Sequence, residues 1–205
     1  MRVYLTGDVC LESGARLIAQ AQLPRRQGRL AFVFLVAERR RAVARDELAE
    51  LLWPARLPPA WAVALSSLVS KLRGLLSRAE PAAGIRSAFG CYQLRLPPGA
   101  WVDTEAALEA VHEAEAALRA GAPERAYGPA VVAGTILRRP FLAGAEGAWV
   151  EARREQLRAH LLRALDCLID VHLWNREPAL ARQVAEESVR LEPFRETGHQ
   201  RLMRA

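Results

Sequence analysis

The stretch AWAVALSSLVSKLRGLLSRA, residues 60–79, decides the fold that we expect for the first half of this 205-residue chain. Prolines stand just before and just after it, and only Gly74 weakens helix formation inside it, so the sequence permits a single helix of about twenty residues. At helical spacing one face is apolar and consists of Leu65, Leu68 or Val69, Leu72 and Leu76. The opposite face carries hydroxyls and cations from Ser66, Ser67, Ser70 and Arg73, with Lys71 at its edge.

Short side chains on the polar face allow the helix to approach another surface closely. Hydroxyls and cations suit phosphate oxygens and base edges, whereas an exposed helix without such a partner more often mixes Glu with Lys. The polar face of residues 60–79 is therefore a candidate DNA contact, and an ordinary solvated face is the alternative.

The charge is distributed unevenly along the chain. Residues 1–102 contain 15 Arg and Lys against 7 Asp and Glu, a net charge of +8, whereas residues 103–205 contain 14 against 16, a net charge of −2. This asymmetry favours a polyanion as the partner of the first half and a different partner for the second. Hydrophobic residues make up 51% of the chain and charged residues 25%, values typical of a globular protein.

The sequence lacks the residue patterns of enzymes and metal sites. It has no phosphate-binding loop, no nucleophile elbow and no carboxylate pair flanked by histidine. Its cysteines, Cys10, Cys91 and Cys167, are far apart and have no histidine at ligand spacing. We therefore predict a protein without enzymatic activity, cofactor or metal. Since neither a signal peptide nor a long apolar run is present, we expect a cytoplasmic protein that does not enter the membrane.

Several short elements precede the long helix. Residues 3–11 and 16–23 partly alternate apolar and polar side chains around a Ser-Gly turn, which predicts a small hairpin-like sheet. The run GRLAFVFLVAERRR from Gly28 predicts a helix that extends into the arginines at 39–41, whose charges complement a helix C-terminus. A short helix is expected over residues 45–53, with acids in its first turn.

Two helices joined by a Pro-containing link, the second with a basic outer face, satisfy a helix-turn-helix pattern. Residues 85–96 indicate two strands with a turn at residues 88–90, and a hairpin directly after a candidate recognition helix is a wing. The candidate DNA contacts are hydroxyl-bearing or cationic residues on the helix, on the wing and before the helix: Ser66, Ser67, Ser70, Lys71, Arg73, Arg78, Arg86, Ser87, Arg45 and Arg56.

The second half of the chain is helical throughout. We expect helices over residues 103–119, 123–138, 146–175 and 178–192, and a last one that begins near Phe194 or Arg195. Tandem helix pairs indicate a tetratricopeptide-like stack, in which each pair buries its apolar face against its neighbours. The predicted fold class is α+β, with a winged-helix domain at residues 1–102 and an all-α domain at residues 103–205.

The first half resembles a known family through the segments ARDELAELLW, VSKLRGLL and GCYQLRLPPGAWVDTE, which begin at Ala44, Val69 and Gly90. Its order of sheet, three helices and wing is similar to the winged-helix effector domain of response regulators, and more closely to the antibiotic regulatory activators known as SARPs. The resemblance implies that the third helix enters the major groove, that the wing contacts the flanking backbone, and that protomers bind direct repeats in promoters.

The second half resembles the bacterial transcriptional activation domain that follows the winged helix in SARPs. The resemblance rests on RRPFLAGAEGAWVEARREQLRAHLLRAL from Arg138 and LEPFRETGHQRLMRA from Leu191. It implies a homodimer, at least on DNA, and contact with RNA polymerase. The last helix reaches Ala205 without a pairing partner, so we expect a longer protein that continues with further repeats or an ATPase.

Two hypotheses of function follow. The first is a transcription activator that binds double-stranded DNA through residues 60–79 and the wing. The second is a protein-interaction scaffold whose degenerate winged helix no longer binds DNA specifically. The net charge of +8 on residues 1–102 favours DNA. We predict DNA binding that depends steeply on salt, and loss of most affinity when Lys71→Ala and Arg73→Ala are combined.

Overall fold

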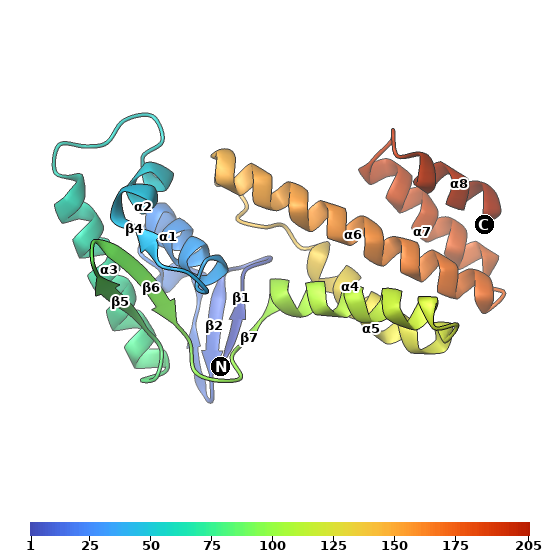
Figure 1. The fold of residues 1–205 in the computed structure, drawn as a ribbon, viewed down its shortest axis with the longest axis horizontal. Coiled ribbons are helices and arrows are strands. Elements are labelled where there is room, and N and C mark those ends of the chain that lie inside the picture. The colour runs from blue at the N-terminus through green and yellow to red at the C-terminus, as the bar shows by residue number, and fades with distance from the viewer. The chain divides into compact units, whose positions relative to one another are not determined.

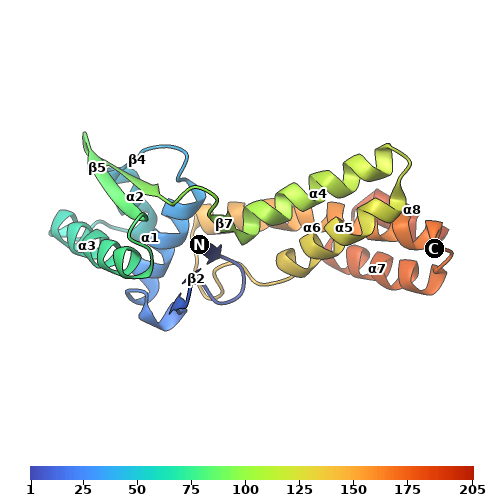
Figure 2. The same ribbon diagram turned by 90° about the horizontal axis from the view of Figure 1, so that it is seen from below.

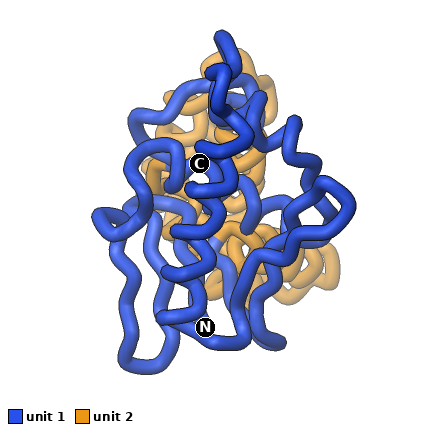
Figure 3. The backbone as a smooth tube through the Cα atoms, turned by 90° about the vertical axis from the view of Figure 1, so that its left-hand side faces the viewer, with its two compact units in different colours: residues 1–103, 141–152 blue, residues 104–140, 153–205 orange.

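The computed structural model describes residues 1–205, which form two compact units. Unit 1 comprises residues 1–103 and 141–152, and unit 2 comprises residues 104–140 and 153–205 (Figure 3). The predicted α+β class is confirmed, because both small sheets lie in unit 1 and unit 2 consists of helices (Figure 1). The predicted domain boundary between residues 102 and 103 stays a prediction. Each compact unit is a group of residues in contact and combines two separate segments of the chain, so the units do not test a boundary drawn along the sequence.

The first sheet of unit 1 has four short strands, in the order β3 (Arg16–Ile18), β2 (Cys10–Ser13), β1 (Arg2–Tyr4) and β7 (Trp101–Val102). β1 runs antiparallel to β2 and parallel to β7, and β2 and β3 form the predicted hairpin around the Ser-Gly turn. The extended run expected over residues 3–11 divides into two strands. The chain turns at Gly7, whose φ of 72° is easily adopted only by glycine, and resumes as β2.

Three helices of unit 1 pack against one another: α1 (Arg25–Ala37), α2 (Arg45–Leu52) and α3 (Trp61–Ala79). The expected extension of α1 into residues 39–41 is wrong, because α1 ends at Ala37. Leaving the helix allows Arg41 to donate to Glu38 at 2.7 Å and to pair with Glu47 on α2. The arginine run is therefore a link between α1 and α2 and not a helix end.

The second sheet of unit 1 has the order β4 (Val43–Ala44), β6 (Cys91–Arg95) and β5 (Gly84–Ala88), and all its pairings are antiparallel. The β5–β6 hairpin directly follows α3 and lies alongside it (Figures 1 and 2). Pairing of Ala88 with Cys91 leaves Phe89 and Gly90 as the turn, within the residues predicted for it. Tyr92 and Leu94 are buried and hold the hairpin on the core.

The five helices of the second half begin and end within two residues of the predicted positions. They are α4 (Asp103–Arg119), α5 (Pro123–Leu137), α6 (Ala148–Trp174), α7 (Pro178–Leu191) and α8 (Glu196–Arg204). In unit 2 a fully buried cluster of Ile169, Ala181 and Ala185 joins α6 to α7, and Leu202 of α8 packs against it. None of the helices combines the length and the apolar composition that crossing a bilayer requires.

The segment between α5 and α6 contributes to the core of unit 1. Phe141 pairs with Thr6 in an isolated β-bridge, and the rings of Phe141 and Trp149 lie 6.0 Å apart. The ring of Trp149 in turn meets that of Phe34 on α1 edge-on at 5.0 Å. The sequence predicts a helix break here. The structure shows that this break places Phe141 and Trp149 next to each other and Trp149 against α1.

A hydrogen-bonded cluster joins α4 to α6 in unit 2. Arg163 donates to both carboxylate oxygens of Glu115, at 2.7 and 2.8 Å, and its guanidinium lies 3.0 Å from Nδ1 of His160. Since a guanidinium can only donate, Nδ1 must accept, which requires a neutral His160 ring. Burial, together with the charge of Arg163, lowers the pKa of His160 below its ordinary value of 6.5.

We expect the free energy of unfolding of unit 2 to decrease as the pH falls below about 6.5. In this range His160 binds a proton in the unfolded chain but stays neutral in the folded one, so protonation favours the unfolded state. Hydrogen bonds from Arg163 also lower the pKa of Glu115, which adds a second loss below the ordinary value of 4.5 for that carboxyl. Urea unfolding at a series of pH values should show a smaller loss of stability near pH 6 in His160→Gln than in the wild type. The exposed His199→Gln serves as the control, and equal pH slopes in both variants would contradict the assignment.

Candidate nucleic-acid interface

The outward face of α3 has the orientation that the sequence predicts. Leu65, Val69, Leu72 and Leu76 are each exposed by no more than 2%, and their burial fixes the rotation of the helix. The sequence left open whether Leu68 or Val69 belongs to the apolar face. Val69 is buried, whereas Leu68 is only half-buried. The polar residues point away from the core, and those that are exposed are Ser66, Ser67, Ser70, Lys71, Ser77 and Arg78.

The middle of this outward face carries only short side chains. Val63, Ser67, Ser70 and Gly74 follow one another at helical spacing along it, and all four are exposed. Gly74 has open space above it, because a Cβ atom at this position would meet no atom within 4 Å. A second surface can therefore come close to the backbone of α3 along its length.

One edge of α3 borders an open groove formed with the start of α1. Lys71 and Arg78 line this groove from α3, and Arg25 and Arg26 line it from α1. All four side chains are exposed, and no hydrogen bond or ion pair engages their charged groups. Four unpaired cations in one groove attract a polyanion and repel one another in its absence.

The opposite edge of α3 borders a second groove, formed with the β5–β6 hairpin. Polar and aromatic side chains line it, among them Arg45, Ser66, Arg73, Ser87 and Phe89. Arg73 donates from Nε to the carbonyl of Ile85 at 2.8 Å and from Nη2 to Oγ of Ser87. Arg73 thus fixes the hairpin against α3, a role that the sequence did not reveal.

The predicted contact residues separate by their surroundings. Ser67, Ser70, Lys71, Arg78 and Arg86 are exposed and not engaged in hydrogen bonds of their side chains. Four others already have partners in unit 1: Arg73 and Ser87 bind each other, the hydroxyl of Ser66 donates to the carbonyl of Ala62, and Arg45 approaches Ser66 at 3.5 Å. Arg56 lies exposed in the loop between α2 and α3 and lines neither groove.

Arg25 and Arg26 were missed by sequence reasoning. The signal in the sequence is the dibasic pair in LPRRQG, just before the apolar run of α1 and about 45 residues before Lys71. Only the packing of α1 beside α3 brings the two cationic pairs to one groove.

The helical half was compared with known protein families. Residues 102–205 match the family of the bacterial transcriptional activator domain, and this match spans half of the chain. The chain belongs to this family. The matched domain is one of transcription regulators rather than of enzymes, which confirms the SARP-type assignment made from the sequence. The bacterial transcriptional activator domain begins at residue 102, so α3 and the β5–β6 hairpin precede the matched residues.

The fold of the whole chain is similar to that of EmbR from Mycobacterium tuberculosis, whose structure was solved in complex with a low-affinity phosphopeptide. The two chains share 21% sequence identity with a TM-score of 0.84, and the similarity covers 99% of this chain and 53% of EmbR. This member of the bacterial transcriptional activator domain family therefore has the EmbR-like fold and spans about half the length of EmbR. No match was found among curated protein sequences.

Proposed function

We propose that the protein is a transcription activator that binds double-stranded DNA with α3 in the major groove and the β5–β6 hairpin as a wing. In this proposal unit 1 supplies a winged helix-turn-helix built from α2, α3 and the hairpin. The short side chains along α3 let the helix enter the groove, where hydroxyls can bond base edges. The cations along its edges then meet the phosphates on either side.

The observation that carries the proposal is the pairing state of the basic side chains around α3. Lys71 and Arg78 share a groove with Arg25 and Arg26, and all four are exposed without ion-pair partners. Several arginines of unit 2 are instead paired with carboxylates, as in the contact of Arg163 with Glu115. Cations that have no counter-charge within the protein fit a binding site in which a polyanion supplies the counter-charges.

The second half of the chain, residues 103–205, is proposed to act as the activation domain. Its family membership supports self-association on DNA and contact with RNA polymerase as its roles. A dimer formed through this part would place two copies of α3 on one promoter, on half-sites repeated in the same direction. Footprints separated by whole helical turns would support this arrangement.

The salt dependence of DNA affinity tests the proposal. Neutralising about five phosphates gives a slope near −4.5 in a plot of log K against log salt concentration. Lys71→Ala should reduce the size of this slope by about 1, because one phosphate contact is lost. Arg73→Ala should lower the DNA affinity but change the salt slope less than Lys71→Ala does. Its main effect is to remove the hydrogen bonds that hold the β5–β6 hairpin against α3. The two substitutions combined should weaken binding about thirtyfold in fluorescence anisotropy titrations.

Arg125→Ala is the matched control, because Arg125 is an exposed cation on α5 of unit 2. Its slope and affinity should equal those of the wild type. Affinity that ignores both salt and the Lys71 and Arg73 substitutions would exclude DNA binding through α3. Retained binding to a protein partner in that case would support the scaffold hypothesis instead.

A further inference from the structure

The tip of the β5–β6 hairpin exposes a complete aromatic side chain. Phe89 has a relative exposure of 103%, so its side chain is not buried against any other part of the protein. Its neighbours in the chain are small or polar, namely Arg86, Ser87, Ala88 and Gly90. The ring is therefore an isolated apolar projection and not part of an apolar patch. Protein interfaces usually bury such anchors within a ring of further contacts, and the hairpin offers none.

Phe89 also occupies an unfavourable backbone conformation. The two turn residues have positive φ angles, 49° at Phe89 and 71° at Gly90. A two-residue hairpin turn with both φ angles positive is of type I′, for which Asn-Gly is the preferred sequence. A bulky residue at its first position is strained, and such strain is found at functional positions.

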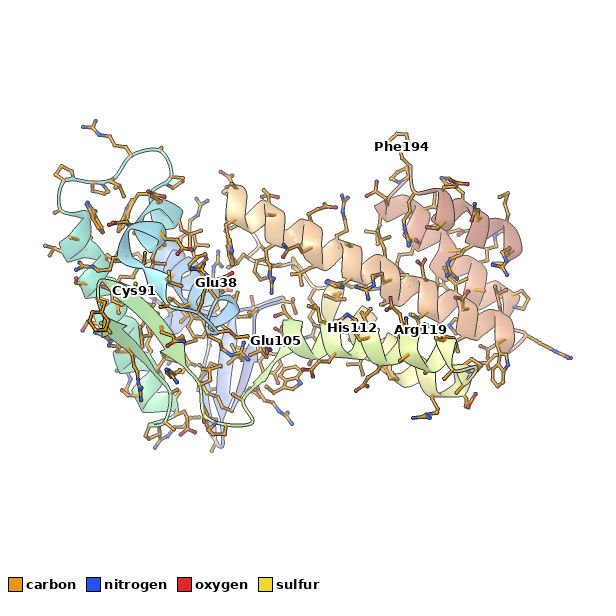
Figure 4. All side chains as sticks on the ribbon, viewed as in Figure 1. Glu38, Cys91, Glu105, His112, Arg119 and Phe194 are labelled. Carbon is orange, nitrogen blue, oxygen red and sulfur yellow. The ribbon has the colours of Figure 1, made fainter.

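The backbone of the tip is held in place by three contacts, so the Cα position of Phe89 is fixed although its ring is exposed. The carbonyl of Gly90 accepts a hydrogen bond from the backbone N–H of Arg45 at 3.0 Å. Ala44 pairs with Cys91, the first residue of β6 (Figure 4), and Ser87 is held by Arg73. Because the backbone of the turn is held in place, binding through Phe89 requires no ordering of the loop that carries it.

We infer that Phe89 inserts into the DNA minor groove as an apolar wedge and partly unstacks one base step. This inference rests on the proposed DNA binding of α3. One sugar–phosphate strand separates the major groove from the neighbouring minor groove, and an open groove likewise separates the exposed face of α3 from the tip of the hairpin. Arg45 and Arg73 line that groove with positive charge, and Phe89 lines it from the turn of the hairpin. Apolar side chains placed in this way kink duplexes in many minor-groove complexes.

The test compares Phe89→Asn with the wild type on DNA selected by the wild type from random-sequence duplexes. Asn suits the type I′ turn, so amides of β5 and β6 should exchange with solvent more slowly in the variant. Its DNA affinity should nevertheless fall about tenfold, with an unchanged salt slope, because the lost interaction involves no phosphate. 2-Aminopurine placed at steps flanking the α3 site should brighten on binding the wild type and stay dim with the variant.

Phe194→Asn is the matched control, since Phe194 is exposed by 95% at the turn before α8 and its side chain points away from the helices (Figure 4). This variant should bind the selected DNA as the wild type does. Equal affinity of Phe89→Asn and the wild type would overturn the wedge and leave the proposed DNA binding intact, as would a loss of affinity without any aminopurine signal in the wild type. If the wild type selects no duplex, the proposed function itself fails, and the wedge with it.

Discussion

Asp103→Ala is expected to lower the free energy of unfolding of unit 1 by about 3 to 5 kcal/mol. The Asp103 carboxylate is fully buried and accepts hydrogen bonds from the backbone N–H groups of Leu5 and Thr6, each at 2.9 Å. It also accepts from the hydroxyl of Thr6 at 2.8 Å. Alanine would leave these donors buried without their acceptor. Urea unfolding followed by tryptophan fluorescence measures the loss, since four of the five tryptophans lie in unit 1.

The position of Asp103 explains why so much depends on one side chain. β7 pairs in parallel with β1 up to Val102, and the chain then turns into α4 at Asp103. Beyond this pairing, the Asp103 carboxylate accepts the hydrogen bonds of the backbone N–H groups of Leu5 and Thr6, the two residues that follow β1. Its negative charge also lies at the N-terminus of α4, where the helix dipole favours it.

Two variants bracket this expectation. Asp103→Asn keeps one acceptor oxygen but directs an NH2 group at a backbone donor, so an intermediate loss is expected. Glu109→Ala removes an exposed carboxylate from the same helix and should change stability by no more than about 0.5 kcal/mol. An Asp103→Ala variant as stable as Glu109→Ala would refute the role assigned to the buried carboxylate.

Where the fold is set by local patterns, the sequence was sufficient to predict it. The apolar spacing of residues 65, 69, 72 and 76 determined which side of α3 is buried, because a helix has only one way to hide such a stripe. Prolines and glycines likewise marked the ends of the later helices, and Gly121, with a φ of 70°, forms the predicted turn between α4 and α5.

Where the structure depends on distant partners, the sequence was not sufficient. The local pattern predicts that the arginines at 39–41 continue α1, whereas the helix ends at Ala37 and Arg41 pairs with Glu47 on α2. The binding of Phe141 beside Thr6 joins residues 135 positions apart, which no local pattern encodes. Arg73 belonged to the predicted DNA-facing set by helical spacing alone, whereas its two hydrogen bonds to β5 depend on the position of the hairpin. The same limit applied to the groove of Arg25 and Arg26.

Asp166→Ala is expected to cost unit 2 about 3 kcal/mol and to release α8 from the helical stack. The side chain of Asp166 is exposed by only 15% and is shared by two arginines of the α8 region. Arg195 donates to it from both terminal nitrogens, and Nε of Arg201 lies 3.3 Å from its Oδ1. Removing the carboxylate leaves the partly buried guanidinium of Arg195 without its counter-charge and leaves Arg201 with only its second partner, Asp170.

The loss should be concentrated in α8 because this helix spans nine residues and is too short to persist alone. Its Leu202 packs on the cluster of Ile169 and Ala181, so detachment would expose apolar surface as well as charge. Hydrogen exchange of the α8 amides should accelerate strongly in Asp166→Ala while the amides of α3 in unit 1 stay protected.

Glu186→Ala removes an ion pair of the same chemistry in a different setting, since Arg182 and Glu186 on α7 are exposed by 70% and 45%. Solvent screens that pair, so its loss should cost no more than about 0.5 kcal/mol and leave α8 exchange unchanged. The two variants each remove one carboxylate, and they differ in its burial and in the number of arginines that share it. Equal effects of Asp166→Ala and Glu186→Ala would mean that apolar packing alone retains α8, and that the two arginines contribute no more than surface charges.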